Sequence, residues 1–466
     1  MRSEPAPTRA QRAPATRDQV DAYRFGLRRL EAALVRGDPV PLHEQLRAQR
    51  RAVFAGMLVG LLALGVTALL ARVDPATDWR RQELVRGERS GVLYAVATDP
   101  ARLVPVPDPV AGRLVLAALG RGGAAAVPVP VPDDALAAAP RTPPAGVAGT
   151  VGVPLDGAPV PAAWAVCGTA GEADRPGPLA VLAGSLAPDT HAAVPPMLLS
   201  VEGGSGYLLH GGRRHRVDVA DRDVLNGLGM LGAPVRRIPD GLLSPIPEGP
   251  PLRIPEPGPV DVPGLGRAGQ VVLSQPLGAP PAHYLVVDGG LAPIPVTLAD
   301  AVLSRTGQGR PAVLAQGRVA TAPSASVSGA QAWPPARSTG GTAGPVLCAT
   351  WRDGRAGVMV GDRMPVAPGA VPVGLAGADG AGPRLDEVVL PASGPGPLRD
   401  GEPGGTGGTR RVLTASGAVH GVADDPTAAA LGIGAAGAAP AAMVRLLPRA
   451  GVLDLAAARA VTDVPG

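Results

Sequence analysis

The chain has 466 residues, of which glycine and proline make up about a quarter and aromatic residues only 2%, so its core has to be built mainly from Val, Leu and Ala between many turns. The sequence contains no lysine, which excludes a P-loop, because the P-loop lysine reaches the β- and γ-phosphates of a nucleotide. The first 52 residues hold eleven arginines and six acidic residues, so their net positive charge exceeds the +4 of the whole chain. Because the excess charge is confined to this short segment, the basic composition does not indicate nucleic-acid binding.

Residues 1–52 contain a predicted amphipathic helix. Thr16 and Gln19 have the spacing of a capping box, and Gly37 marks a helix end. Apolar residues follow at alternating steps of three and four and form one seam along the helix: Val20, Tyr23, Leu27, Leu30 and Leu34. A lone helix of this length has no core of its own. We therefore expect the seam to pack on a partner protein, with the membrane surface as the alternative.

The next segment is predicted to span a membrane. The nineteen residues Val53–Ala71 carry no charge, and at about 1.5 Å per residue they give a helix of roughly 28 Å, close to the thickness of a bilayer core. We expect a membrane helix over residues 53–72, flanked by arginines at Arg47, Arg50, Arg51 and Arg72. The excess of arginine ahead of this helix favours a cytoplasmic N-terminus and an extracytoplasmic region 73–466. A cleaved signal peptide fits less well, because the stretch ahead of the apolar run is too long.

The region 73–466 shows signs of internal duplication. Residues 103–111 resemble residues 291–299 at an offset of 188, and the segment at Gly227 resembles the segment at Ala430 at an offset of about 203. We expect an α+β fold, mainly β, in an elongated pseudo-two-fold domain. Its predicted parts are four small hairpin-plus-helix repeats at about 88–120, 204–253, 280–308 and 410–460, and central β material at about 150–200 and 310–366. The stretch 367–410 is interpreted as a linker because it is rich in glycine and proline.

Cys167 and Cys348 are the only cysteines of the chain. In an oxidising compartment a single pair favours one long-range disulfide, and two buried free thiols are the alternative. If the two positions are equivalent in the duplication, their bond would hold the two halves together. A structural zinc site is not expected from two cysteines this far apart and six histidines.

The sequence offers little that indicates catalysis. Gly264–Gly269 matches GxGxxG, but a strand is predicted after it where a dinucleotide site needs a helix, so we interpret it as a turn. His210 and His215 flank a predicted hairpin tip, and two histidines without a third ligand do not make a metal site. Three arginines of the same hairpin form either a solvated tip or a site for an anionic partner or polymer: Arg213, Arg214 and Arg216. We therefore predict no catalytic, cofactor-binding or metal-binding residues.

Five segments carry a resemblance to a known family: Arg17–Phe25, Leu27–Leu34, the Leu-His-Glu stretch at 42–44, Arg47–Arg50 and Ser90–Tyr94. They are similar to EccB, the single-span membrane component of actinobacterial type VII (ESX) secretion systems. The resemblance implies a central β domain, four repeats similar to a phage lysin cell-wall-binding fold, and a disulfide between Cys167 and Cys348. It also implies partners, namely the FtsK-like motor ATPase EccC, EccD, EccE and the mycosin protease.

These observations lead to three functional hypotheses. The favoured one is a structural core subunit of a type VII secretion complex, self-associating, in the cytoplasmic membrane, with its C-terminal domain in the periplasm. The second is a module whose repeats bind peptidoglycan. The third is an ATP-hydrolysing subunit with a site other than a P-loop, because ATPase activity is attributed to the family; the residues above do not support it. No nucleic-acid partner is expected.

Overall fold

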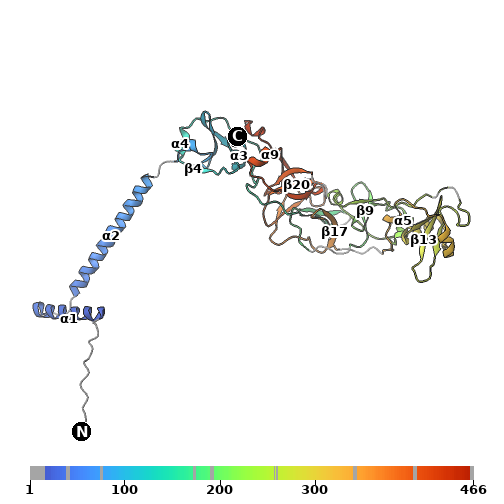
Figure 1. Ribbon diagram of the computed structural model, residues 1–466, viewed down its shortest axis with the longest axis horizontal. Helices are drawn as coiled ribbons and strands as arrows, with labels where there is room; N and C mark the ends of the chain where they lie inside the picture. The colour runs from blue at the N-terminus through green and yellow to red at the C-terminus, as the bar shows by residue number, and fades with distance from the viewer. Residues whose placement is uncertain are drawn as a thin grey trace, which may run out of the picture. The chain divides into compact units, whose positions relative to one another are not determined.

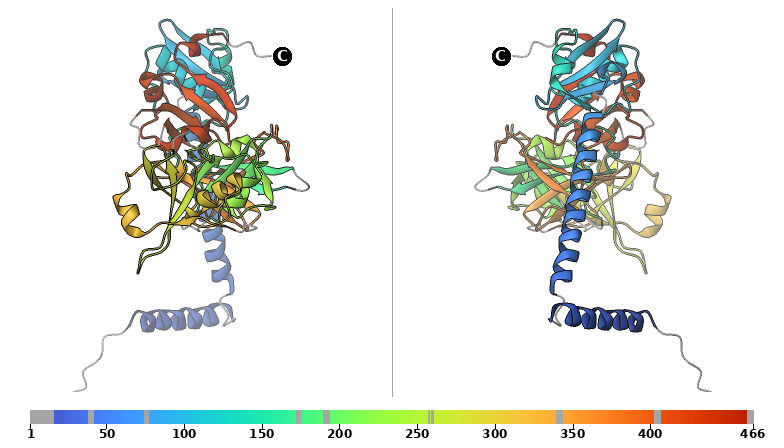
Figure 2. Two further views of the ribbon diagram at one scale, coloured as in Figure 1. Left: turned by 90° about the vertical axis from the view of Figure 1, so that its right-hand side faces the viewer. Right: turned by 90° about the vertical axis from the view of Figure 1, so that its left-hand side faces the viewer.

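The computed structural model describes residues 16–37, 42–73, 77–171, 175–188, 194–256, 258, 261–338, 344–401 and 407–461. The chain divides into two compact units, Met1–Thr77 and Asp78–Gly466 (Figure 1). The described part of the first unit is helical and that of the second unit is mainly β, as the sequence predicts. Further views are given in Figure 2.

The first helix, α1 (Arg17–Arg36), begins and ends where its capping residues predict. The Thr16 hydroxyl accepts a hydrogen bond from the Gln19 amide at 3.4 Å, and the Gln19 side chain accepts one from the Thr16 amide at 3.1 Å. At the other end Gly37 takes a left-handed conformation with φ of 67°, and its amide donates to the carbonyl of Ala33. These bonds satisfy backbone groups that the helix itself leaves unpaired.

The second helix, α2 (Leu42–Val73), is 32 residues long. Its residues Gln49–Leu69 have a mean hydropathy of 2.3, and none of the most apolar part is buried, so this helix is suited by length and composition to cross a membrane. The Thr67 hydroxyl donates to the carbonyl of Leu64, which satisfies a polar group within the apolar stretch. The predicted span 53–72 therefore lies within one longer continuous helix.

The second unit contains four repeats that share one order of elements among the described residues. Each repeat has a three-stranded antiparallel meander, a helix, a strand parallel to the first strand of the meander, and a short helix. A last segment then runs parallel to the third strand of the meander, as a strand in the second and fourth repeats and as an isolated bridge in the others. The repeated order is a physical trace of duplication.

The bounds of these elements follow the chain. The first repeat comprises β1 (Leu84–Gly87), β2 (Leu93–Thr98), β3 (Ala101–Val106), α3 (Pro109–Ala118), β4 (Val129–Val131) and α4 (Asp133–Ala137). The second comprises β7 (Met197–Ser200), β8 (Gly206–His210), β9 (Arg213–Arg216), α5 (Arg222–Leu228), β10 (Val235–Arg237), α6 (Asp240–Leu243) and β11 (Glu248–Gly249). The third comprises β12 (Val271–Ser274), β13 (Ala282–Val287), β14 (Gly290–Ile294), α7 (Val296–Thr306), β15 (Ala312–Val313) and α8 (Gln316–Thr321). The fourth comprises β20 (Pro397–Gly401), β21 (Thr409–Leu413), β22 (Val419–Val422), α9 (Asp425–Ala430), β23 (Gly437–Pro440), α10 (Ala441–Val444) and β24 (Arg449–Leu453).

The proline-rich first repeat accommodates its prolines at positions that tolerate them. Pro105 lies in β3, which is an edge strand of its sheet, where a missing amide hydrogen costs no ladder bond. Pro109 is the first residue of α3 and directly follows the cap residue Asp108. At this position the amide hydrogen would have no partner within the helix, so its absence in proline costs nothing. The segments 103–111 and 291–299, matched by sequence, both run from the third strand of a meander into its helix.

A six-stranded central sheet lies between the repeats in the chain and has the order β17-β16-β5-β6-β19-β18. Its strands are β5 (Ala163–Ala170), β6 (Pro176–Leu182), β16 (Val346–Arg352), β17 (Arg355–Gly361), β18 (Val371–Gly374) and β19 (Glu387–Leu390). The interpretation of 367–410 as a linker is wrong, because β18, β19 and β20 lie in it. β19 is buried between β18 and β6, and β6 belongs to a hairpin about two hundred residues earlier.

Shared hydrophobic cores join the repeats in pairs. The second and third repeats pack α5 against α7, and Gly227 of α5 lies so close to Ala301 that a Cβ atom would come within 2.5 Å of the alanine Cβ. The first and fourth repeats pack α3 against α9 (Figure 1). The second and fourth repeats also place α6 and α10 against β5 of the central sheet, where Leu242 and Met443 enter its core. The pairing gives the pseudo-two-fold order predicted from the sequence.

Candidate functional site

The apolar seam of α1 is exposed to solvent. Its exposed fractions range from 38% for Val20 to 85% for Leu34, with Tyr23, Leu27 and Leu30 between them. Phe25 and Val35, which lie off the predicted seam, are also more than half exposed. A helix of twenty residues gains little stability in water unless its apolar face is covered, so the geometry of α1 suits a docking element.

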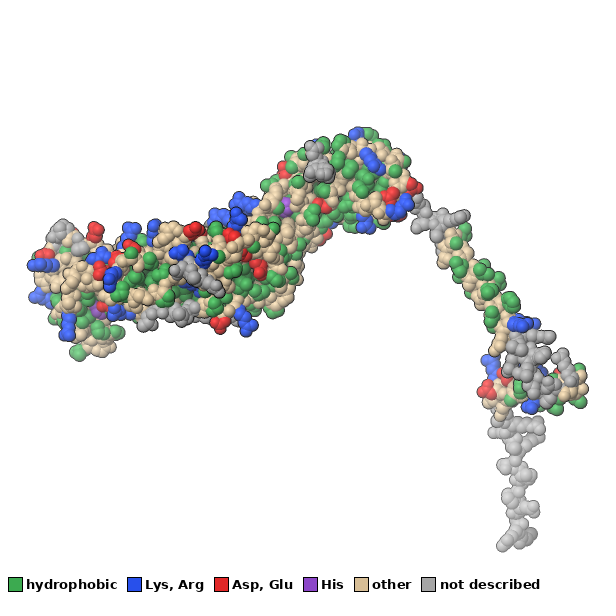
Figure 3. Space-filling model, turned by 180° about the vertical axis from the view of Figure 1, so that it is seen from behind, with side chains coloured by type: hydrophobic (Ala, Val, Ile, Leu, Met, Phe, Trp, Pro, Cys, Tyr) green, Lys and Arg blue, Asp and Glu red, His purple; other side chains and the backbone are tan. Residues whose placement is uncertain are grey.

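The membrane helix α2 carries large apolar side chains around its whole circumference. Leu58, Leu61, Leu62 and Leu64 are each more than 60% exposed, and Figure 3 shows hydrophobic side chains along the visible face of this helix. A helix that is apolar all round is stable in lipid and not in water. Arg50 and Arg51 are exposed at its N-terminal side, whereas the side chains of the other predicted flanking arginines, Arg47 and Arg72, lie outside the described residues.

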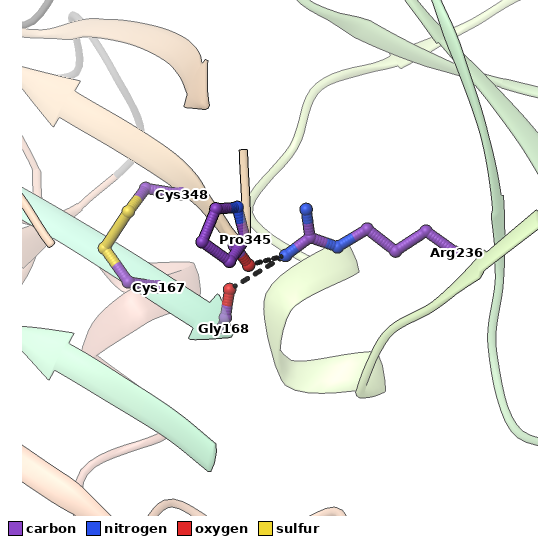
Figure 4. The surroundings of a disulfide bond; sticks show 5 residues. All are labelled: Cys167, Gly168, Arg236, Pro345 and Cys348. Carbon is purple, nitrogen blue, oxygen red and sulfur yellow. Dashed lines mark hydrogen bonds between the residues drawn. A yellow bond between two sulfur atoms is a disulfide. The ribbon is translucent and has the colours of Figure 1, made fainter. Parts of the chain in front are cut away.

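The two cysteines form the predicted disulfide in the centre of the second unit (Figure 4). Cys167 of β5 lies directly opposite Cys348 of β16, with 4.1 Å between the two Cα atoms, and both side chains are fully buried. The bond closes a loop across 181 residues of sequence. Because the two strands come from the two halves of the duplication, the disulfide ties those halves together within the central sheet.

Arg236 of β10 anchors the second repeat beside this disulfide. Its Nη2 atom donates to the carbonyl oxygens of Gly168 at 3.2 Å and Pro345 at 2.5 Å (Figure 4), and Nη1 donates to that of Gly344 at 3.1 Å. Burial lowers the pKa of the Arg236 guanidinium. The sequence analysis missed this residue, because its partners lie 68 to 109 residues away and are backbone atoms.

The predicted arginine cluster on the β8–β9 hairpin is divided by the fold. Arg213 donates to the carbonyl of Glu248, and Arg214 pairs with the Glu248 carboxylate at 3.1 Å and donates to the carbonyl of Leu243. Arg216, the last residue of β9, is exposed and forms no side-chain hydrogen bond or ion pair with a residue that the structure describes. Two of the three cations are therefore used inside the repeat, which leaves one for an external ligand.

The two histidines of the second repeat lie in different environments. His215 is buried, with its Nδ1 atom 2.9 Å from the carbonyl oxygen of Pro250. His420 takes the equivalent position in the fourth repeat, with Nδ1 3.0 Å from the carbonyl oxygen of Gly451. Burial and the charge of His215 lower the pKa of His210. Within the described ranges no three His, Cys, Asp or Glu residues gather as metal ligands. The sequence offset between His215 and His420 is close to the offset between the second and fourth repeats. That offset was the signal in the sequence that could have identified the two histidines as equivalent positions.

The GxGxxG segment lies on turns, as expected. Gly264, Gly266 and Gly269 all have positive φ values, and the chain then enters strand β12. The carbonyl of Gly264 accepts a hydrogen bond from Arg318. A dinucleotide cradle needs a helix at this point, whose N-terminus would face the phosphates.

Comparisons with known proteins cover nearly the whole chain. The family profile described as "Type VII secretion system ESX-1, transport TM domain B" matches residues 12–465. The ESX-1 secretion system ATPase EccB1 of Mycolicibacterium smegmatis is 28% identical over 95% of this chain and 94% of the relative. The ESX-3 secretion system ATPase EccB3 of the same species is 30% identical over 90% and 85%.

Solved structures give a matching picture. A chain of an intact ESX-5 inner membrane complex superposes with a TM-score of 0.71 at 25% identity, over 98% of this chain and 97% of that chain. A chain of the EccB3 dimer from the ESX-3 core complex superposes with a TM-score of 0.67 at 25% identity, over 81% of this chain and 100% of that chain. The similarity therefore includes the helical N-terminal unit as well as the repeats.

Proposed function

The chain belongs to the EccB family of type VII (ESX) secretion proteins, and from this membership we propose that it is a structural core subunit of a secretion complex in the cytoplasmic membrane. The observation that carries the proposal is the structural match over 98% of this chain to a subunit of an ESX-5 inner membrane complex. The one membrane-suited helix among the described residues and the disulfide-tied second unit give the chain the parts that such a scaffold needs.

We place the N-terminus in the cytoplasm and residues 73–466 in the periplasm. Two observations support this orientation. Eleven arginines against six acidic residues precede the membrane helix, and positive charge favours the cytoplasmic side. The buried disulfide lies in the second unit, and disulfides persist in oxidising compartments outside the cytoplasm.

The α1 seam is the proposed docking surface for cytoplasmic parts of the complex. An exposed apolar stripe on a capped helix suits a helix-in-groove contact. The family resemblance implies EccC, EccD and EccE as partners within the complex and the mycosin protease beside its periplasmic part. Self-association is supported by the ESX-3 relative, whose structure is a dimer.

The scaffold role is favoured over ATP hydrolysis, although the names of the relatives contain the word ATPase. A P-loop cannot occur in a chain without lysine. The glycine-rich segment that most resembles a nucleotide motif, Gly264–Gly269, precedes a strand.

The test of the proposed role is identification of the proteins that remain bound to the chain. We expect mass spectrometry of the affinity-tagged full-length protein, extracted from its own membranes in mild detergent, to find an FtsK-like motor ATPase in stoichiometric amounts. Recovery of the tagged chain without any other membrane subunit, under conditions that preserve other membrane complexes, would contradict the proposal.

A further inference from the structure

A hollow of about 580 Å³ opens in the second repeat, between β9 and α5. It is bordered by the glycine turn Gly203–Gly206, by the end of β9, and by the segment Leu252–Ile254. Its volume lies in the range of sites that bind small ligands or a few residues of a peptide. No site discussed above uses it.

Two guanidinium groups at this hollow have no partner among the described residues. Arg216 and Arg253 are both exposed, and neither side chain forms a hydrogen bond or ion pair with any residue that the structure describes. The third arginine of the hollow, Arg305, is used internally, since its Nη2 and Nε atoms lie 2.5 and 2.6 Å from carboxylate oxygens of Asp221 and Asp223. An unpaired pair of guanidinium groups is a recognition element for anions, because each can bind a carboxylate through two parallel hydrogen bonds.

The remaining lining is mixed. Its floor contains apolar side chains, namely the buried Val217, Val224 and Leu252 and the half-buried Val219 and Ile254. The lining also includes the Asp218 carboxylate, which accepts a hydrogen bond from the Ala220 amide and offsets part of the positive charge. The turn beside it exposes backbone, because Gly203 and Gly204 have positive φ values and no other atom within 4 Å of where a Cβ would stand. An extended peptide with alternating acidic and apolar side chains would place carboxylates at the arginines and apolar groups on the floor.

We propose that this hollow is a docking site for an acidic, partly apolar peptide segment of another protein, held by Arg216 and Arg253. The proposal rests on the scaffold role in one respect only, namely that a neighbouring protein of the complex would supply the acidic segment. A synthetic peptide tests the site without any other subunit, so the result is independent of whether the secretion complex is recovered.

The probe is a fluorescein-labelled Glu-Val-Glu-Val-Glu peptide, and its binding to the full-length protein in detergent is measured by fluorescence anisotropy. We expect binding that weakens as NaCl is added, a Kd at least tenfold higher for the double variant Arg216→Gln/Arg253→Gln, and a Kd within twofold of wild type for Arg237→Gln. Arg237 is the matched control, because it is an exposed arginine of the same repeat that does not line the hollow. Equal binding by the wild type and the double variant, or equal binding of a Gln-Val-Gln-Val-Gln peptide, would overturn the proposal.

A second measurement does not depend on the variants folding. Phenylglyoxal modifies exposed arginines, and mass spectrometry of the wild-type protein reports which ones react. The proposal expects the peptide to protect Arg216 and Arg253 and to leave Arg237 reactive. If poly(glycerol phosphate) protects the two arginines and the peptide does not, the hollow takes an anionic polymer and the proposal is wrong.

Discussion

Cys167 and Cys348 face each other on the neighbouring strands β5 and β16, which the two duplicated halves contribute to one sheet. A cross-link between positions so far apart in sequence restricts the unfolded chain strongly, with a stabilisation of about 3–5 kcal/mol in the chain-entropy model. We expect the double variant Cys167→Ala/Cys348→Ala to unfold at a markedly lower temperature than the oxidised wild type. Differential scanning calorimetry with and without reductant measures the effect. Full alkylation of both thiols in unfolded, non-reduced protein would show that the bond is absent.

Arg236 holds the second repeat against the strand ends beside the disulfide. Removing the side chain removes three hydrogen bonds to carbonyl oxygens, although the Pro345 oxygen keeps a second donor, the Ala170 amide. A hydrogen bond to a charged group contributes about 1.5–3 kcal/mol at most. We expect Arg236→Met to lower the free energy of unfolding by about 2 kcal/mol, compared with no more than about 0.5 kcal/mol for the exposed neighbour in Arg237→Met. Denaturant titration of the two variants checks this, and equal stabilities would refute the anchoring role.

Gly227 permits the close crossing of α5 and α7. A larger residue would meet the Ala301 side chain and the Thr297 carbonyl oxygen, both 2.5 Å from a Cβ at this position. We expect Gly227→Val to destabilise the second unit by about 1–3 kcal/mol through overpacking. Gly309→Val is the control, because no atom lies within 4 Å of its Cβ position. Hydrogen exchange should show faster exchange in α5 and α7 for the first variant only; unchanged protection there would contradict the packing account.

Asp223 links the second and third repeats in a pH-dependent way. Hydrogen bonds from the Ser304 hydroxyl at 2.7 Å and from Arg305 at 2.6 Å lower its pKa below the usual 3.8. Because the folded pKa lies below the unfolded one, the stabilisation is fully present above about pH 4 and is lost as the pH falls through the lowered folded pKa.

We therefore expect Asp223→Asn to melt below the wild type near neutral pH and the difference to shrink towards pH 2. Melting temperatures measured across this range test the sign. Glu202→Gln is the control for replacing an exposed carboxylate of the same repeat by an amide, and we expect it to melt close to the wild type near neutral pH. A gap between Asp223→Asn and wild type that stays constant down to pH 2 would contradict the linkage.

The sequence predictions that the structure confirms depend on residues that are close together in the chain. The capping box of Thr16 and the stop at Gly37 depend only on residues within one turn, and the apolar run of α2 depends on composition. The repeats were visible because the junction between the third strand and its helix keeps its residues in two copies, at 103–111 and 291–299.

Features that depend on distant partners could not be predicted. β19 is a strand because it pairs with β6, and nothing within its glycine- and proline-rich surroundings indicates that pairing. In the sequence nothing distinguishes Arg236 from an arginine on the surface, because its anchoring role depends on hydrogen bonds to carbonyl groups of distant segments. The three arginines of the β8–β9 hairpin were indistinguishable in sequence, and only the position of Glu248 separates Arg213 and Arg214 from Arg216.

If this chain is built into a membrane secretion complex through α1, its native mass should depend on the α1 seam. We would extract three tagged full-length proteins in mild detergent, namely wild type, the seam variant Leu27→Glu/Leu30→Glu, and the control Arg28→Ala, which changes an exposed α1 residue outside the seam. Native electrophoresis with mass spectrometry then compares them. We expect wild type and control to migrate in an assembly that is far larger than the 46.4 kDa chain and contains the motor ATPase. The seam variant should lose this assembly while its second unit melts as in wild type. A wild-type chain that migrates as a monomer or dimer, or a seam variant that assembles normally, would contradict this expectation.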